Sequence, residues 1–419
     1  MIVRISRYIL IVVSIVVMAI YLPDLYWLFF DVKTSSPYVS YSPVDSMFIM
    51  YRHGDNGLVF YDEEGNTYTR EEYEEKLPLF YYMQLIADGR MPDSLHGIPL
   101  DPNEIKTNRN NHRIRTYTHD VPQIPLYPLL ESESGRVTLE FPDEFFRITD
   151  KGMEFVNSKT KKVNKEKSAL FTDALKNADF QFPAKRVYTN PTTRKPFDEG
   201  CFVIDNKNEF YHIKRAKDQP VVRNTRLPEE INICYMLVSE NNLKEYYGII
   251  ISEDNRLFFL TYDNYKLVEL PTKGIYKVGE MTVVITTDLF FRQVTLNKND
   301  GIDVFVTDRN YNLIDEYHES WKPREAYPQG KVARAIFPFS LSAEDDSSAY
   351  VGLYSEWHFP LAWIGNLISL LLFALFVKKE GRTWKGAIPE LILVTLTGIY
   401  GLIACMVYIY VPLWRSERK

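Results

Sequence analysis

The sequence has few cysteines and none of the short motifs that identify many enzymes and cofactor sites. Its 419 residues include only 3 Cys, with no Cys-x-x-Cys pair that would indicate a redox centre, a zinc site or haem attachment. The nucleophile elbow Gly-x-Ser-x-Gly, the phosphate-binding loop and the metalloprotease pattern His-Glu-x-x-His are also missing. We therefore predict no cofactor and no metal ion, assign no catalytic residue, and favour a non-enzymatic protein.

The long central part of the sequence lacks an excess of positive charge. The formal net charge of the whole chain is −6, and the segments that flank the central part carry more Lys and Arg than Asp and Glu. The central part is therefore more acidic than the chain as a whole and would repel phosphate backbones. We exclude nucleic acid as a partner on this ground.

Long apolar runs are absent from the centre but present at both ends of the chain. Residues 8–30, 359–377 and 388–414 are each almost wholly apolar, and about 20 such residues are needed to cross the hydrocarbon core of a bilayer. We predict three transmembrane helices over these ranges. The remaining segments are an N-terminus over residues 1–7, a loop over 378–387 and a tail over 415–419.

The distribution of basic residues predicts the orientation in the membrane. Cytoplasmic flanks of membrane helices are enriched in Lys and Arg, which favours placing the N-terminus and the loop 378–387 inside: they contain Arg4, Arg7, Lys378, Lys379, Arg382 and Lys385. The tail, with Arg415, Arg418 and Lys419, is then the exception, because three helices put it outside. We predict a multi-pass inner-membrane protein with most of the chain in the periplasm.

Two further absences bear on the compartment. No small-x-small cleavage site follows the first apolar run, so we predict an uncleaved anchor in preference to a signal peptide. No Asn-x-Ser/Thr sequon occurs in the chain, although a eukaryotic extracellular domain of this length would usually contain some. This favours a bacterial setting.

The central part reads as a mainly β extracytoplasmic domain. Residues 31–135 predict mixed α/β structure and loops, and residues 136–358 predict a β-rich, repeat-like domain. Four strand–turn–strand units carry an aspartate in the turn, at Asp150, Asp205, Asp254 and Asp308. A recurrence near 50 residues is typical of four-stranded propeller blades. A meandering β-sheet remains the alternative, because such turns are common in any β fold and the lysine-rich helical stretch 161–177 is foreign to a blade.

One candidate ligand site lies in the segment 110–120. If this segment is a strand, Arg113, Arg115 and His119 lie on one face and form an anion-binding surface. His112 would then point to the other face, which is poor geometry for a metal site. The alternative is a strand face that is solvated or ion-paired.

Two pairs of residues are further candidates. Cys201 and Cys234 both lie in strand-like sequence of the outer domain and could form a disulfide or remain separate thiols. Tyr354 and Trp357 belong to an aromatic segment just before the second apolar run. Such residues favour the headgroup layer of a bilayer, where they could couple the domain to the membrane or simply anchor it.

The segment 77–94, with the sequence Leu-Pro-Leu-Phe-Tyr-Tyr-Met-Gln-Leu-Ile-Ala-Asp-Gly-Arg-Met-Pro-Asp-Ser, resembles part of an uncharacterised bacterial membrane-protein family, known as a domain of unknown function. The order of anchor, outer domain and helical hairpin resembles that family as well. The resemblance implies an association with ABC-type transporter components, a permease and an ATPase, in Bacteroidetes-like bacteria. It implies no catalytic residues.

Three functions are consistent with these observations. The first is a non-enzymatic accessory, sensor or interaction subunit of a membrane complex, such as an ABC-type transporter, because three membrane helices are more than an anchor needs. The second is a membrane-anchored periplasmic hydrolase that acts on envelope glycan or lipid through carboxylates that the sequence does not single out. The third is an envelope protein that has a structural role or binds a polymer.

Overall fold

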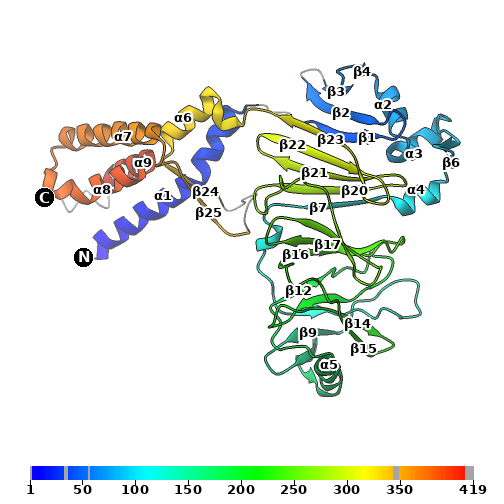
Figure 1. Ribbon diagram of the computed structural model, residues 1–419. Helices are drawn as coiled ribbons and strands as arrows, with labels where there is room; N and C mark the ends of the chain where they lie inside the picture. The colour runs from blue at the N-terminus through cyan, green and yellow to red at the C-terminus, as the bar shows by residue number, and fades with distance from the viewer. Residues whose placement is uncertain (1, 33–35, 55–56, 343–348, 411–419) are drawn as a thin grey trace. The chain divides into compact units, whose positions relative to one another are not determined.

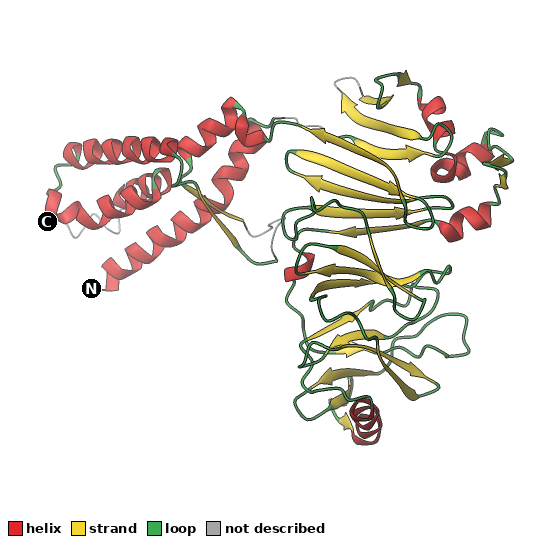
Figure 2. Ribbon diagram, viewed as in Figure 1, coloured by secondary structure: helices red, strands yellow, loops and turns green. Residues whose placement is uncertain are grey.

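The computed structural model describes residues 2–32, 36–54, 57–342 and 349–410 (Figure 1). The chain divides into two compact units. The sheet unit is Ser36–Glu319, and the helical unit combines Met1–Ser35 with Ser320–Lys419. Strands dominate the first and helices the second (Figure 2).

The sheet unit is a succession of antiparallel meanders, and within each meander consecutive strands of the chain are neighbours. Four sheets have four strands each: β1 (Tyr38–Ser42) to β4 (Thr67–Tyr68), β8 (Tyr127–Pro128) to β11 (Val163–Asn164), β12 (Arg186–Thr189) to β15 (Gln219–Asn224), and β16 (Ile233–Val238) to β19 (Leu267–Glu269). A fifth sheet joins β20 (Thr282–Thr287), β21 (Arg292–Lys298), β22 (Gly301–Thr307) and β23 (Leu313–Ser320) to the early strand β7 (Asn110–Ile114). The inner strands are β2 (Met47–Gly54), β3 (Gly57–Asp62), β9 (Glu144–Ile148), β10 (Met153–Asn157), β13 (Cys201–Ile204), β14 (Phe210–Ala216), β17 (Tyr246–Ser252) and β18 (Leu257–Thr261).

The four predicted strand–turn–strand units are confirmed as hairpins, and two of their aspartates bind the backbone of the turn. Asp205 accepts hydrogen bonds from the backbone amides of Lys207 and Glu209 at 2.8 and 2.9 Å, and Asp308 accepts from those of Asn310 and Asn312 at the same distances. Side-chain acceptors of this kind stabilise tight turns. At Asp205 and Asp308 the recurrent aspartate is therefore explained by turn chemistry.

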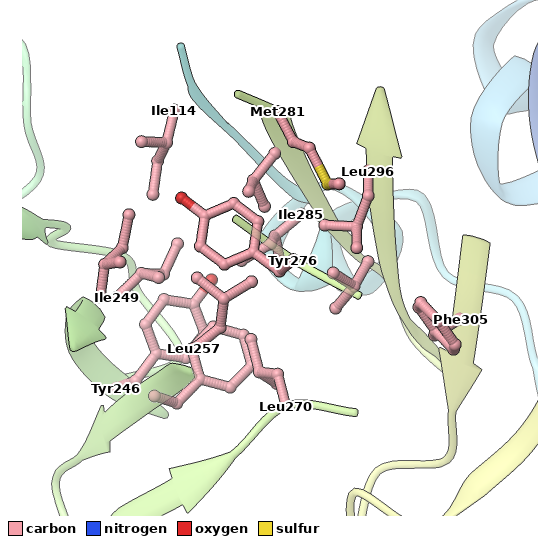
Figure 3. Close-up of a cluster of buried hydrophobic side chains, with 14 residues drawn as sticks. Ile114, Tyr246, Ile249, Leu257, Leu270, Tyr276, Met281, Ile285, Leu296 and Phe305 are labelled. Atoms are coloured by element: carbon pink, nitrogen blue, oxygen red, sulfur yellow. The ribbon is translucent and has the colours of Figure 1, made fainter. Parts of the chain in front are cut away.

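Adjacent sheets share apolar cores because strand side chains alternate between two faces. One face of β12–β15 places Val187, Cys201 and Ile213 against β8–β11, and the other places Phe202 and Phe210 against β16–β19. The other face of β16–β19 packs on the five-stranded sheet through a cluster that includes Tyr246, Ile249, Leu257, Ile285 and Phe305 (Figure 3). Each layer therefore buries apolar surface on its neighbour.

The stack continues from the five-stranded sheet to β1–β4. Tyr41 packs edge-on against Phe291 at 5.1 Å between ring centres, and its backbone amide donates to Oε1 of Gln293 at 3.1 Å. The sheets do not close into a propeller, so of the two predicted β architectures the meandering one holds. Helix α5 (Lys165–Asn177), the predicted helical stretch, instead packs Phe171 and Leu175 into the core beside β8–β11.

The two predicted segments 31–135 and 136–358 share a sheet. Strand β7 precedes residue 136 and pairs with β20, with Ile114 opposite Val283. Short elements complete this region: β5 (Ser94–Leu95), β6 (Ile98–Pro99), α2 (Arg70–Lys76), α3 (Pro78–Ala87) and α4 (Pro102–Asn108). Strands that are far apart in the sequence can pair at the edge of a sheet. For this reason, residues before and after position 136 belong to one unit.

The helical unit contains α1 (Ile2–Phe29), α6 (Pro328–Ile336), the hairpin of β24 (Phe339–Ser342) and β25 (Gly352–Ser355), and α7 (Pro360–Lys379). Within the described residues, Ile5–Phe29 and Pro360–Lys379 are the two helices long and apolar enough to cross a membrane. The third predicted span is not one helix. It forms α8 (Ile388–Thr397) and α9 (Ile399–Tyr410), which are separated by Gly398, and residues 411–414 lie outside the described part.

Gly398 and Gly365 explain why these helices break and pack as they do. Gly398 has φ +55° and ψ −127°, a conformation that L residues avoid. A Cβ atom on Gly365 of α7 would lie 1.6 Å from the carbonyl oxygen of Ala335 in α6, so only glycine permits this contact between the two helices. Gly365 thus lets α6 and α7 approach closely, as small residues do between packed membrane helices.

Candidate functional site

The most highly charged buried region of the sheet unit lies between β12–β15 and β16–β19. Three segments form it: the loop after β12, strand β14 and the loop between β16 and β17. Four of its charged residues are almost inaccessible to solvent: Lys195, Asp198, Glu199 and Glu240. Burying unpaired charges is costly, so the contacts among these groups decide what the cluster can do.

Lys195 lies at the centre and is neutralised by two carboxylates. Its Nζ atom is 2.6 Å from Oδ1 of Asp198 and 2.6 Å from Oε1 of Glu240, and it also donates to the carbonyl oxygen of Asn190 at 2.9 Å. The second oxygen of Glu240 accepts from Nδ2 of Asn190 at 2.7 Å. Desolvation raises the pKa of Glu240, and the attraction of Lys195 opposes that rise.

A second pair and a histidine extend the cluster. Nζ of Lys214 is 2.6 Å from Oε2 of Glu199. His212 donates from Nε2 to the carbonyl oxygen of Glu199 at 2.5 Å, because a carbonyl can only accept, and its Nδ1 then accepts from the hydroxyl of Tyr265 at 2.9 Å. Burial lowers the pKa of His212 to about 3, so the ring is neutral.

Aromatic rings close one side of this region. Tyr247 stacks on Tyr262 at 3.8 Å between ring centres and on Tyr265 at 5.2 Å. Phe202 stacks on His212 at 4.3 Å. Desolvation raises the pKa of Tyr247 and of Tyr262, so neither phenol is ionised at neutral pH.

The arrangement works as an ionic clamp between two sheets and offers little for chemistry. The carboxylates that bind lysine, those of Asp198, Glu199 and Glu240, are buried. A substrate could not reach them as the cluster stands. Within the described ranges, no group of three or more His, Cys, Asp or Glu side chains could hold a metal ion. Asp198 and Glu240 therefore act by holding Lys195, which fixes the loops of neighbouring sheets to each other.

Similar clamps join the next sheets. Arg292, fully buried, makes two hydrogen bonds to the carboxylate of Glu245 at 2.9 and 2.8 Å, which links the five-stranded sheet to β16–β19. Arg52 on β2 binds both oxygens of Glu319 at 2.8 and 3.1 Å, which links β1–β4 to the five-stranded sheet. A guanidinium group that makes two hydrogen bonds to one carboxylate stabilises the contact and also fixes the relative orientation of the two groups. The partners in these two pairs are 47 or more residues apart, and no sequence motif indicates either pairing.

Two grooves in the described part of the sheet unit are candidate ligand sites, and both are small. One, of about 50 Å³, lies between β1, α3 and the five-stranded sheet and includes Tyr38, Phe80 and Asp288 in its walls. The other, of about 210 Å³, is open and lies beside β12, where Gln123, Tyr127 and Lys185 line it. Ligand pockets usually measure about 300–1,000 Å³. Neither groove defines a site for a cofactor-sized molecule.

The predicted anion-binding face rests on a strand that ends too early. Strand β7 stops at Ile114, and a turn and a 3₁₀ helix follow at Thr118–Asp120. Arg113 is on the strand, but Arg115 donates to the hydroxyl of Tyr117 at 2.8 Å, and the ring of His119 is bonded to the carbonyl oxygen of Thr116 at 2.7 Å. The three side chains therefore do not share a strand face, and anion binding itself stays a prediction.

Cys201 and Cys234 are unbridged thiols. Cys201 faces the core that β12–β15 shares with β8–β11, which is the side turned away from β16–β19. Cys234 lies on β16 at a β-bulge. Of the two alternatives left open by the sequence, separate thiols are therefore observed, because the two side chains belong to different layers. Burial raises the pKa of Cys234, so this thiol is less reactive than an exposed one.

Tyr354 and Trp357 lie in the helical unit near the start of α7. Both are about 42% exposed, and Trp357 packs edge-on against Phe339 at 6.3 Å. The carbonyl oxygen of Trp357 accepts from Nε1 of Trp363 at 2.8 Å. Exposed aromatic side chains at the end of an apolar helix are what a bilayer interface favours; their coupling role stays a prediction.

The helical unit also contains a buried ion cluster and a buried amide that were not predicted from the sequence. Glu390 of α8 accepts at Oε1 from Arg7 of α1 at 2.8 Å and from Arg382 at 3.1 Å. Asn366 of α7 is buried and donates to the carbonyl oxygen of Thr395. The signal was available, because a polar residue inside an apolar run is unusual and calls for a partner.

The chain belongs to the family described as a domain of unknown function, DUF4857, whose model matches residues 38–307. This match covers most of the sheet unit. None of the curated proteins matches the chain. An uncharacterised family is thus confirmed, while the match does not address a link to ABC-type transporters or the bacterial group.

Two solved structures are distantly similar. One is PorZ, described as an essential bacterial surface component of the type-IX secretion system of Porphyromonas gingivalis, with 8% identity, coverage of 68% of this chain and 27% of that chain, and a TM-score of 0.21. The other is an exported protein of Bacteroides fragilis, with 9% identity, coverage of 57% and 82%, and a TM-score of 0.11. The chain thus spans about a quarter of PorZ, and scores this low carry no argument about function.

Proposed function

We propose that this protein is an accessory or interaction subunit of an inner-membrane complex, with its sheet unit in the periplasm. The observation that carries the proposal is the packed core of the helical unit. Ile11 of α1, Phe373 and Val377 of α7, Val394 of α8 and Cys405 of α9 are all fully buried in one cluster. A bare anchor needs one apolar helix, whereas helices that pack on one another build a defined surface for membrane partners.

The distribution of tryptophan supports a membrane location for the helical unit. All 6 Trp residues lie in the sequence of that unit, at positions 27, 321, 357, 363, 384 and 414, and the sheet unit has none. Tryptophan is enriched where a membrane helix meets water. Arg324 lies over the ring of Trp27 at 4.6 Å, and Trp363 binds the backbone of Trp357, so these rings lie near the ends of α1 and α7.

Contacts within the helical unit support one orientation. Arg7 and Arg382 both bind Glu390, which brings the start of α1 and the loop after α7 to the same end of the unit. The basic residues of these two segments therefore share one side, as the positive-inside rule requires of a cytoplasmic side. The end of α1 lies at the opposite end, where Tyr26 donates to the carbonyl oxygen of Gln329 at 2.8 Å.

The ABC-type permease and ATPase implied by the family resemblance are the partner class that we propose. The hydrolase alternative has less support, because the buried carboxylates Asp198, Glu199 and Glu240 are held by lysines. A hydrolytic pair of carboxyl groups needs room for a sugar or a water molecule between them. A polymer-binding role is compatible with the sheet stack, but neither of the two small grooves described above supports it.

Affinity purification in mild detergent tests the proposal. The chain would carry a tag after Lys419 and be expressed at its natural level, and partners would be identified by mass spectrometry. We expect recovery of a permease and an ATPase in fixed stoichiometry with the chain. If the tagged chain is captured quantitatively and no partner is recovered with it, the accessory-subunit function is contradicted.

A matched control locates the interaction. In the control protein, the sheet unit Ser36–Glu319 is kept and the helical unit is replaced by a single unrelated membrane helix. Loss of the partners in this control would assign the contact to the helical unit, and retention would assign it to the sheet unit.

A further inference from the structure

The third apolar run reverses direction inside the helical unit. Helices α8 and α9 are joined by the single residue Gly398, and a Cβ atom on Gly401 would lie 3.0 Å from the Cα atom of Val394 and 3.1 Å from the carbonyl oxygen of Leu393. Residues seven and eight apart along one continuous helix would be about 10–12 Å apart. The start of α9 therefore folds back against the end of α8.

Neither helix is long enough to cross a bilayer. Helix α8 has 10 residues and α9 has 12, which at about 1.5 Å per residue gives about 15 and 18 Å. The hydrocarbon core is about 30 Å thick. By contrast, α7 with 20 residues reaches about 30 Å.

Contacts with the other helices show where the hairpin begins and turns. Glu390, near the start of α8, binds Arg7 at the start of α1. At the turn, a Cβ atom on Gly398 would touch the side chain of Asn366 at 2.2 Å and that of Pro338 at 3.2 Å. Helix α8 therefore runs from the end of the unit that holds Arg7 towards the segment that precedes β24.

Helix α9 runs back along α1. The ring of Tyr400, at its start, stacks on Phe337 at 6.0 Å, and Phe337 in turn packs on Tyr26 near the end of α1 at 5.7 Å. Two turns later, the hydroxyl of Tyr408 is 3.0 Å from Oγ of Ser14. The contact with α1 has thus moved from Tyr26 to Ser14, towards the N-terminus.

The polar contacts at the turn suit a helix end inside hydrocarbon. The last carbonyl groups of a helix have no partner within it, and lipid cannot supply one. Nδ2 of Asn366 donates to the carbonyl oxygen of Thr395 at 3.1 Å, and Oγ1 of Thr397 donates to that of Leu393 at 2.6 Å. Asn366 is therefore explained as a cap supplied by a membrane-spanning helix to a neighbour that ends within the membrane.

We infer that α8 and α9 form a re-entrant hairpin, so that the chain crosses the membrane twice, in α1 and α7, and the end of α9 returns to the side on which α1 begins. The inference rests on the proposed membrane location of the helical unit. It removes the conflict in the charge distribution, because Arg415, Arg418 and Lys419 of the tail then follow the same positive-inside rule as Arg7 and Arg382.

Paired topology reporters on the full chain test this inference. Green fluorescent protein fluoresces on the cytoplasmic side, and alkaline phosphatase is active on the periplasmic side. Each would be fused before Met1, inserted at the exposed turn residue Gly135 of the sheet unit, or fused after Lys419. We expect fluorescence at the two ends and phosphatase activity only at Gly135.

The two control positions separate the possible failures. If the reporters before Met1 and at Gly135 indicate opposite sides, and the reporter after Lys419 agrees with Gly135, the hairpin crosses the membrane and the inference is overturned while the membrane location stands. If Met1 and Gly135 report the same side, the proposed location fails and the inference fails with it.

Discussion

Asn366 in α7 donates a hydrogen bond of 3.1 Å from its side chain to the backbone carbonyl oxygen of Thr395 in α8. The bond joins a helix long enough to span a bilayer to one that is about half that length. A carbonyl group that loses its partner in an apolar interior costs about 1–3 kcal/mol. This contact therefore explains both why α7 contains a buried amide and how α8 can end where it does.

Replacing Asn366 by Leu is expected to loosen the hairpin of α8 and α9. Because Thr395 loses its donor, we expect amide hydrogen exchange over residues 388–410 to accelerate about tenfold, which corresponds to about 1.4 kcal/mol. Ser369→Ala is the control, because its hydroxyl donates to Gly365 of its own helix at 2.9 Å. Equal exchange rates in both variants would show that the amide does not cap α8. Exchange measured by mass spectrometry in detergent gives this readout.

Lys195→Met is expected to destabilise the sheet unit by about 3–5 kcal/mol, because Asp198 and Glu240 would be left buried without a counter-ion. The triple variant K195M/D198N/E240Q should recover part of this loss. The exposed pair Arg136 and Glu140 provides the control, and R136M should cost less than about 1 kcal/mol. Urea unfolding followed by circular dichroism would measure these differences. A loss at Lys195 no greater than at Arg136 would contradict the clamp.

His212 should make the sheet unit less stable in acid. Its pKa is about 3 in the folded state because of burial, and about 6.5 when unfolded. Below pH 6.5 the unfolded chain takes up a proton that the folded chain does not, so stability falls as the pH falls from 6.5 towards 3. At pH 5 the free energy of unfolding is lowered by about 2 kcal/mol through His212.

The variant His212→Gln tests the pH dependence. It cannot take up the proton, so its stability should fall by about 2 kcal/mol less than that of the unmodified protein between pH 7.5 and pH 5. Urea unfolding at the two pH values provides the comparison. A parallel decline in both proteins would show that His212 has no such role.

Brominated lipids should quench the fluorescence of this protein. All 6 Trp residues belong to the sequence of the helical unit, so its emission reports that unit alone. In vesicles with bromine on the acyl chains, we expect emission to fall by about half or more relative to unbrominated vesicles, because interfacial rings lie next to the chains. Unchanged emission would contradict the proposed membrane contact. The variant Trp357→Phe should show a smaller fraction of its tryptophan emission quenched by the brominated lipid.

The strand pattern of the sheet unit could be read from the sequence, because hairpins leave local signals. Asp205 and Asp308 occur where a short polar turn joins two apolar strands, and the structure has hairpins at both. The order in which sheets pack is not local. The pairing of Ile114 with Val283 and the contact of Arg52 with Glu319 join residues 169 and 267 positions apart, respectively, and no nearby residue indicates either.

The helical unit shows a different limit of sequence analysis. Hydropathy identifies apolar residues but does not show where a helix reverses its direction. The apolar run 388–414 therefore predicts one membrane span, whereas Gly398 divides it into two helices. The backbone conformation at a glycine depends on what packs against it, here Asn366 and Pro338. The same holds for Arg115 and His119, whose predicted shared face required the strand to continue past Ile114.

The size and composition of the native complex test the central claim most directly. The chain would be solubilised from its own membranes in mild detergent and resolved by blue-native electrophoresis, followed by denaturing electrophoresis and mass spectrometry of each spot. We predict that the 49.1 kDa chain migrates within a larger assembly that contains other membrane proteins at constant ratio. Migration as the chain alone, or as a multiple of it, would contradict its role as a subunit of a membrane complex.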